Sequence, residues 1–315
     1  MKIAFYQDHI CLRGTTVAMV DYAKYNQEIL GNDSVVIYNR TNKNNDDTAI
    51  KNVIENDISL VCLDDFSEIH DLTRGCKLLY QQRACASDGR LSSSCKNVIH
   101  QIGANVPHSQ SWGDVYAYAS EWLRTHNSVP NAPLVPYIVT LPHSSDNFRE
   151  SLGIPKEAIV FGRSGGPDTW NLPWSNHVIL KILEVRKDIY FLFQNTPIPF
   201  EHEKVIHVEK TSNLDYKVKF INTCDAMLHA RHEGESFGMS CAEFSIRNKP
   251  VITWDGSRER NHIDILGDRG VYYSDAQSMF DCLYGFVKHP EKNWNCYGEF
   301  SPGSVMKLFK EVFID

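Results

Sequence analysis

The chain has 315 residues, of which 42% are hydrophobic and 23% charged, the usual balance of a globular protein. The 32 basic residues against 39 acidic ones give a net charge of −7, which argues against a general nucleic-acid-binding protein. No apolar run approaches the roughly 20 residues that cross a bilayer, so we expect no transmembrane segment and at most peripheral membrane contact.

Length and cysteine usage indicate the domain number and the compartment. A single α/β core usually stops growing at about 250–300 residues, which favours two domains here. The nine cysteines are odd in number and none has CxxC spacing, which argues against a disulfide framework or a zinc site. The N-terminal MKIAFYQD starts as a strand rather than as a secretory signal. We therefore expect a reduced, cytoplasmic protein.

The N-terminal third alternates strands and helices. Apolar runs predict strands at residues 2–6, 34–39 and 59–64, and helical spacing predicts helices at 17–30 and 48–55. This order is typical of a parallel sheet with crossover helices.

The pattern continues less regularly toward a proline-rich boundary. We expect strands at residues 76–80, 97–102 and 134–139, a strand leading into a helix at 114–126, and a loop at 81–95. Four prolines between residues 130 and 142 place a boundary after these elements. The predicted domains are residues 1–145 and 146–302, with a C-terminal helix, residues 303–315, packing back on the first domain.

The same alternation restarts in the second half. Strands are predicted at residues 158–163, 189–195, 204–209, 226–230, 250–254 and 271–274, and helices at 174–186, 214–222, 237–247 and 276–289. The predicted fold class is α/β, with two tandem Rossmann-like domains facing across a cleft. Ligands of such sheets bind at the carboxyl ends of the strands.

The stretch HEGESFGMSCAEF carries the chemistry of the second half. Glu235 lies in the loop after a buried strand, Gly238 stands at the first turn of a predicted helix, and Glu243 follows about two turns later. A glycine at a helix amino end lets an anion such as a phosphate approach the free N–H groups. On spacing alone, Glu243 fits a solvated or ion-paired side chain as well as a ligand contact.

The segment from Glu235 to Glu243 resembles the E-x7-E signature of retaining, nucleotide-sugar-dependent glycosyltransferases of family 4, which have the GT-B fold. A Pro-Val strand follows in NKPVITW, and FRESLGIPKEAIVFGR upstream resembles the start of the family's nucleotide domain. The resemblance covers residues 148–254, about a third of the chain, and is weak over the first half.

The resemblance implies roles for the residues of this signature. Glu243 would bind the ribose hydroxyls of the donor, and Glu235, as a catalytic residue, would contact hydroxyls of the donor sugar. The backbone at Phe237, Gly238 and Met239 would approach the diphosphate and the sugar. These would be donor-binding positions.

A cation for the departing diphosphate is also implied. Arg163 would neutralise it as a catalytic residue. The family usually has a lysine about five residues further on, where this chain has Asp168. Arg231 is our candidate replacement in the donor site, and a salt bridge with Glu233 or Glu235 is its alternative role.

Further site residues are expected in other strand-end loops. Gly165 lies in a Gly-rich loop without a Walker or dinucleotide fingerprint. Gly14 and Thr15 fit the loop that the family closes over the donor, although Thr15 or Thr16 could simply cap a helix. His100 ends a strand where it would meet the acceptor or the transferred sugar as a catalytic residue. A core histidine is the alternative.

Weaker candidates lie elsewhere. Asp88, Gly89 and His108 stand in loops expected to face the cleft. For His262 we expect a solvated helix face rather than a ligand contact.

The sequence thus predicts a glycosyltransferase that moves a sugar from a nucleoside-diphosphate sugar to a hydroxyl of a glycan, lipid-linked or protein acceptor. Retention of configuration is implied by the resemblance only. No metal or cofactor is expected, because no Asp-x-Asp stands in a strand-end loop between the sheets. The alternatives are a nucleotide-sugar epimerase, a non-catalytic nucleotide-sugar or glycan-binding protein, and a dinucleotide oxidoreductase. The absence of GxGxxG in both halves counts against the last.

Overall fold

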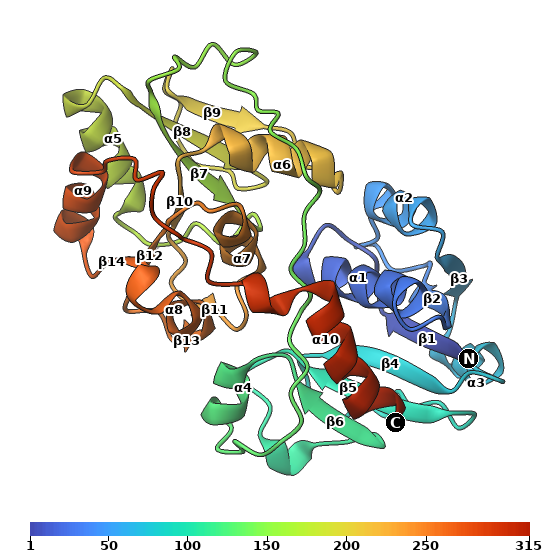
Figure 1. Ribbon diagram of the computed structural model, residues 1–315. Helices are drawn as coiled ribbons and strands as arrows, with labels where there is room; N and C mark the ends of the chain where they lie inside the picture. The colour runs from blue at the N-terminus through green and yellow to red at the C-terminus, as the bar shows by residue number, and fades with distance from the viewer. The chain divides into compact units, whose positions relative to one another are not determined.

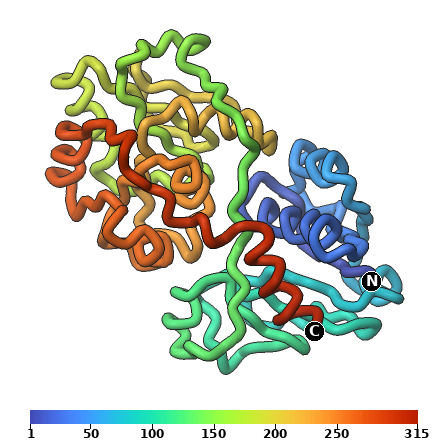
Figure 2. The backbone as a smooth tube through the Cα atoms, in the orientation of Figure 1, coloured from blue at the N-terminus to red at the C-terminus, as the bar shows by residue number.

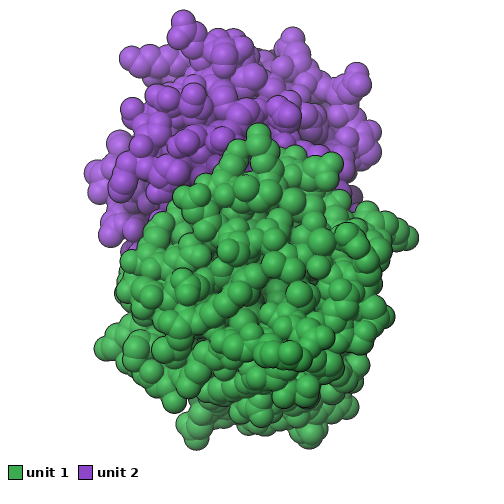
Figure 3. All heavy atoms as spheres, turned by 90° about the vertical axis from the view of Figure 1, so that its right-hand side faces the viewer, with its two compact units in different colours: residues 1–138, 300–315 green, residues 139–299 purple.

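The computed structural model describes all residues from 1 to 315 and divides them into two compact units. Unit 1 comprises Met1–Ile138 and Phe300–Asp315, and unit 2 comprises Val139–Glu299 (Figure 3). The first boundary therefore lies at Ile138, slightly before the position that the prolines indicate. The tube in Figure 2 shows the C-terminal residues returning to unit 1, the domain on which the sequence places the last helix.

Unit 1 is a six-stranded parallel sheet in the order β3-β2-β1-β4-β5-β6, the order of a Rossmann fold (Figure 1). Its helices, α1 to α4 and α10, connect the strands or return from the C-terminus. The bounds are β1 Lys2–Gln7, α1 Gly14–Glu28, β2 Asp33–Asn39, α2 Asp47–Glu55, β3 Ser59–Leu63, α3 Ile69–Leu72, β4 Leu78–Arg83, β5 Lys96–Gln101, β6 Val115–Tyr118, α4 Glu121–His126 and α10 Pro302–Phe309.

Unit 2 repeats this topology in the order β14-β12-β10-β7-β8-β9, again all parallel. Numbered along the unit, the strands have the same 3-2-1-4-5-6 arrangement as in unit 1. A two-stranded ribbon of β11 and β13 is added. The bounds are β7 Ile159–Ser164, α5 Ser175–Val185, β8 Ile189–Gln194, β9 Val205–Val208, α6 Leu214–Thr223, β10 Ala226–His229, β11 Gly234–Glu235, α7 Met239–Ile246, β12 Val251–Trp254, β13 Glu259–Arg260, α8 Asn261–Leu266, β14 Val271–Tyr273 and α9 Ala276–Tyr284.

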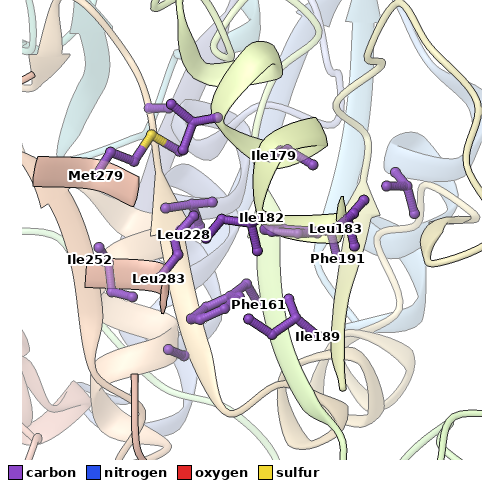
Figure 4. Packing of buried hydrophobic residues seen from close by; sticks show 14 of the residues in the cluster. Phe161, Ile179, Ile182, Leu183, Ile189, Phe191, Leu228, Ile252, Met279 and Leu283 are labelled. Atoms are coloured by element: carbon purple, nitrogen blue, oxygen red, sulfur yellow. The ribbon is translucent and has the colours of Figure 1, made fainter. Parts of the chain in front are cut away.

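Each sheet is covered on both faces, which is why its strands read as continuous apolar runs. In unit 2, α5 and α9 cover one face, and Ile182 and Leu283 pack there against Phe161 and Leu228 of the strands (Figure 4). On the other face, Phe220 of α6 meets Phe244 of α7 with their rings 5.9 Å apart.

The C-terminal helix completes the core of unit 1. Phe309 of α10 packs 5.2 Å from the ring of Tyr22 on α1 and 5.7 Å from that of Tyr80 on β4. Lys96 Nζ donates a hydrogen bond to the carbonyl of Phe313, 2.9 Å away. Residues at opposite ends of unit 1's sequence therefore share one hydrophobic core.

Three sequence predictions about elements are wrong in detail. The polar residues 81–83 belong to β4 rather than to a loop: all three are buried, and Gln81 and Arg83 have polar partners at the strand's carboxyl end. Residues 134–139 form no strand, since only Leu134 makes a bridge, to Tyr118. Helix α7 begins at Met239 instead of Phe237, because Gly238 adopts a left-handed conformation with φ 90°.

No helix of the chain combines the length and the apolar character that a membrane span requires. All nine cysteines are free thiols.

Candidate functional site

The candidate site of unit 2 lies where its strand order reverses, between β7 and β10. Parallel α/β sheets bind ligands outside the carboxyl ends of the strands at this switch point. Here β7 ends with Arg163 and Ser164, and β10 ends with His229. The loops that follow bring Gly165, Arg231 and Glu235 to the same edge.

Arg163 is a buried cation with free hydrogen-bonding capacity. Its side chain is 1% exposed, and Nη2 donates to the carbonyl and hydroxyl oxygens of Thr169 at 2.9 and 2.8 Å. Nε and Nη1 have no hydrogen-bond partner. Burial lowers the pKa of this guanidinium, while the charge of Glu235 acts in the opposite direction. Because a buried unpaired donor is unfavourable, the geometry suits an anion that accepts from these nitrogens.

The position of the Arg163 side chain leaves no room for a side chain at residue 165. A Cβ atom at Gly165 would lie 2.6 Å from both Arg163 Nη2 and Thr169 Oγ1. The Gly-rich loop therefore lets the guanidinium lie directly against the backbone.

Glu235 is an ionised carboxylate fixed by two neighbours. Its Oε1 lies 3.1 Å from His229 Nε2, and its Oε2 accepts from Arg231 Nη1 at 3.1 Å. Burial alone would raise the pKa of Glu235, but the hydrogen bond from His229 and the charges of Arg231 and Arg163 outweigh it and hold the pKa well below its usual range. Arg231 thus forms the salt bridge that the sequence left open.

Two further polar residues continue the hydrogen-bond chain from the other ring nitrogen of His229. Its Nδ1 lies 2.9 Å from Thr253 Oγ1, which lies 3.1 Å from His262 Nε2. Burial lowers the pKa of His229, and it lowers that of His262 to about 3, so both imidazoles are neutral near pH 7. A carboxylate only accepts, so His229 carries its proton on Nε2 and accepts from Thr253 on Nδ1. This chain of hydrogen bonds fixes the orientation of Glu235.

The amino end of α7 borders Glu235. Gly238 caps the helix with φ 90° and ψ 54°, and a Cβ there would lie 2.9 Å from His262 Cβ and 3.4 Å from Glu235 Cβ. The carbonyl of the buried Phe237 accepts from Tyr297 at 3.2 Å. Met239 is the first residue of the helix, whose amino-terminal N–H groups and dipole favour negative charge.

Glu243 lies deeper on α7 in an ion pair. Its Oε1 accepts from Lys217 Nζ on α6 at 2.7 Å, and both side chains are largely buried, at 5% and 15% exposed. The ion-paired role that spacing allows is therefore present. A ligand at Glu243 would also meet Lys217.

The catalytic role predicted for His100 disagrees with its position. The side chain is completely buried in the core of unit 1, with Nδ1 2.5 Å from the hydroxyl of Tyr80 and its ring packed on those of Tyr22, Tyr137 and Phe313. Burial lowers its pKa to about 4. This position, enclosed by aromatic rings, agrees with the core alternative rather than with contact to a substrate.

Gly14 and Thr15 lie in unit 1, apart in the chain from the unit 2 site. Helix α1 begins at Gly14 with Arg13 as its N-cap, and no side chain caps it, so the capping alternative is wrong. Thr16 instead donates to Gln7 Oε1 at 2.9 Å and so ties the loop to the end of β1.

Of the residues that hold Glu235, the sequence indicates only Arg231, as one of its alternative roles. His262 is expected on a solvated face and is completely buried, and the sequence assigns no role to His229 and Thr253, which support Glu235, or to Lys217, which pairs with Glu243. The one available signal is a histidine and a threonine near the carboxyl ends of adjacent apolar strands. That His229 and Thr253 are neighbours on adjacent strands can be seen only in the folded sheet.

Comparison with known proteins gives the fold. No family model and no curated protein matches the chain. Among solved structures, HepE of Anabaena in complex with UDP-glucose is 12% identical, with a TM-score of 0.72 over 99% of this chain and 98% of that one. A glycosyltransferase of Rickettsia africae is 14% identical, with a TM-score of 0.72 over 100% and 99%. A putative UDP-N-acetylglucosamine 2-epimerase of Listeria monocytogenes is 12% identical, with a TM-score of 0.62 over 99% and 96%.

The likeness covers both units of this chain and essentially the whole of each neighbour. The chain therefore has the two Rossmann-like domains of the GT-B architecture, and the predicted α/β class with two such domains is confirmed.

Proposed function

We propose that the protein is a glycosyltransferase that uses a nucleoside-diphosphate sugar. The observation that carries the proposal is Arg163, a buried guanidinium at the switch point of unit 2 with two nitrogens unpaired. A diphosphate supplies oxygen acceptors with the charge that this environment requires. The similarity to HepE, solved with UDP-glucose, supports the same reading at the level of the fold.

Each part of the site has a role in the proposed reaction. Arg163 stabilises the negative charge that develops on the leaving diphosphate, and the N–H groups at Gly238 and Met239 approach the diphosphate and the sugar. Glu235, oriented by His229 and ionised near neutral pH, accepts hydrogen bonds from hydroxyls of the donor sugar. Arg231 neutralises Glu235 and takes the place of the family's lysine beside the phosphates.

Glu243 binds the ribose in this proposal, and Lys217 keeps its carboxylate in place for the two ribose hydroxyls. In this proposal Arg163 and Arg231 supply the positive charge beside the phosphates, so the reaction needs no metal. Retention of configuration is proposed from the E-x7-E resemblance, and the cytoplasm is proposed from the nine free cysteines. The acceptor is a glycan, lipid-linked or protein hydroxyl.

The experiment is thermal denaturation with UDP-, GDP-, ADP- and TDP-sugars. A donor at 100 times its Kd adds about 2.7 kcal/mol of stability, which is readily measured. We expect one nucleotide class to stabilise the wild type and Arg163→Gln to lose that shift. Arg149→Gln is the matched control, because Arg149 is a mostly buried arginine of unit 2 that is paired with Asp225 at 2.8 Å. Equal shifts in both variants would contradict the proposal.

A nucleotide-sugar epimerase is the second candidate, favoured by the similarity to the Listeria structure. Donor consumption with no acceptor present and no hydrolysis would establish it in place of transfer. A non-catalytic binding protein is distinguished by Glu235→Gln. Transfer that survives this substitution would exclude catalysis at this site.

A further inference from the structure

The connection between β8 and β9 in unit 2 contains no helix (Figure 1). In unit 1 the equivalent connection, from β2 to β3, contains α2, which packs beside β3 with Ala49 and Val53 buried. The two connections are equivalent because each joins the second strand of its unit to the third, which lies at the edge of the sheet. Parallel strands are usually joined by a helix that covers the sheet. Strand β9 therefore lacks the helix that its counterpart in unit 1 has.

The sequence of residues 195–204 explains why no helix forms there. Pro197 and Pro199 lie in this segment, and a proline provides no N–H for a helix and disfavours a helical conformation of the residue before it. Ile198 and Phe200, which alternate with the prolines, pack half-buried against the core of the sheet. The connection is thus a single irregular chain, which fills less space than a helix about 10 Å wide.

A cavity of about 660 Å³, open to solvent, lies at this position. Every residue that lines it belongs either to residues 197–203 or to β9. Its volume falls within the range of small-molecule sites, about 300–1,000 Å³. The missing helix has therefore left a space that is large enough for a ligand.

Part of the cavity lining is apolar and aromatic. Val205 and His207 lie two residues apart on β9 and so point to the same face of the sheet. The exposed ring of His207 stacks on that of Phe193 with the centroids 5.6 Å apart. Ile198 and Phe200 add apolar surface from the connecting segment. These side chains suit the hydrocarbon part of a ligand.

The carboxylates in the lining have no neutralising partner. Glu201 and Glu203 are both exposed and form no ion pair, and the lining includes no lysine or arginine. The adjacent Lys204 is engaged elsewhere: its Nζ donates to the carbonyl of Lys187 at 2.6 Å and lies 5.7 Å from the centre of the Tyr190 ring. The cavity therefore favours a positively charged ligand.

This cavity is separate from the candidate donor site of unit 2. The donor site lies at the carboxyl ends of β7 and β10, whereas the cavity lies at the edge strand β9, on the other side of β8. The two sites share no residue, and their charges are opposite. Arg163 and Arg231 favour an anion, whereas Glu201 and Glu203 repel one.

We propose that the cavity binds a small organic cation that carries an apolar group, of the class of the primary alkylamines. The alkyl chain packs on Phe200, Val205 and His207. The ammonium group lies beside Glu201 and Glu203. The proposal rests on the lining of the cavity and is independent of the transferase function.

The test is an NMR titration of the isotope-labelled, full-length protein at pH 7 with hexylamine, ethylamine, hexanol and hexanoate. We expect hexylamine to shift the amide signals of residues 197–207 and to bind more tightly than hexanol and hexanoate. Ethylamine should bind at least about tenfold more weakly than hexylamine, because it lacks four methylene groups that the cavity would bury.

The charge of the cavity is tested with the double variant Glu201→Gln/Glu203→Gln. It should weaken hexylamine binding about two- to tenfold, the effect of two exposed ion pairs, and leave hexanol binding unchanged. Glu150→Gln/Glu157→Gln is the matched control, because it makes the same change in net charge at exposed positions outside the lining. The control should leave the Kd of hexylamine unchanged.

No shifts in residues 197–207, hexanoate binding as tightly as hexylamine, or equal effects of the two double variants would overturn the proposal. Displacement of hexylamine by UDP would also overturn it, because the cavity would then belong to the donor site. Tighter binding of Nα-acetyl-lysine amide than of hexylamine would do the same, by assigning the cavity to a lysine side chain of a partner protein.

The cation site and the transferase function fail separately. Arg163→Gln should remove the donor-induced thermal shift and leave the Kd of hexylamine unchanged, because Arg163 does not line the cavity. Absence of any donor-induced shift in the wild type would end the transferase proposal while hexylamine binding remained.

Discussion

The surroundings of the side chain, rather than its burial, separate Arg163 and His100, two of the three predicted catalytic residues. Both stand near the carboxyl end of a strand in their sheets and both are completely buried. His100 Nδ1 pairs with Tyr80 and its Nε2 has no partner, but aromatic rings pack around it, whereas Arg163 keeps two unpaired nitrogens and lies within the field of the Glu235 carboxylate. Position at the end of a strand could not separate them, because the face on which such a residue packs depends on which helices cover the sheet.

Stability at acidic pH should report the burial of His100. Its pKa falls from 6.5 in the unfolded chain to about 4 in the folded one, so the neutral form is favoured by folding. The contribution is complete above pH 6.5 and is lost at about 1.4 kcal/mol per pH unit as the pH falls toward 4. In urea unfolding from pH 7 to 4, the advantage of the wild type over His100→Phe should shrink. A pH-independent difference would contradict the assignment.

At the scale of elements, the amino end of α7 depends on one glycine. Gly238→Ala forces a side chain into a left-handed conformation and against His262, so we expect a loss of about 1–3 kcal/mol in the free energy of unfolding. The donor-induced thermal shift should also decrease, because the amides at Gly238 and Met239 are displaced. Gly303→Ala in α10 meets no atom within 4 Å and should be neutral or stabilising by up to about 1 kcal/mol. Equal effects of the two substitutions would contradict this account.

Helix α10 supplies an essential part of unit 1. Phe309 fills the space between Phe5, Tyr22 and Tyr80, so Phe309→Ala should reduce the free energy of unfolding by about 3–5 kcal/mol. Lys307→Ala on the exposed side of the same helix is the control and should change it little. A small effect at Phe309 in chemical denaturation would mean that the C-terminal segment is not part of the core.

Most elements could be predicted from local patterns, and the exceptions have a common cause. Apolar runs identified β1, β2, β7 and β10 because both faces of each sheet are covered. The polar end of β4 was read as a loop, since Gln81 and Arg83 find their partners only in the folded sheet. The E-x7-E spacing indicated Glu235 and Glu243, but their partners His229 and Lys217 come from other elements and carry no local signal.

For the whole molecule, the proposed reaction predicts independence from divalent metal ions. In that proposal, Arg163 and Arg231 supply the positive charge for the departing diphosphate. We therefore expect that dialysis against EDTA leaves the rate of nucleotide release from the donor unchanged. Loss of activity that Mg²⁺ or Mn²⁺ restores would show that the two arginines are insufficient.

The most direct test of the account is a crystal structure of the full-length protein with its nucleotide-sugar donor. We predict diphosphate oxygens within about 2.7–3.2 Å of Arg163 Nε or Nη1, near the amino end of α7, with the ribose at Glu243. A diphosphate bound elsewhere, with both Arg163 nitrogens still unpaired, would contradict the central claim.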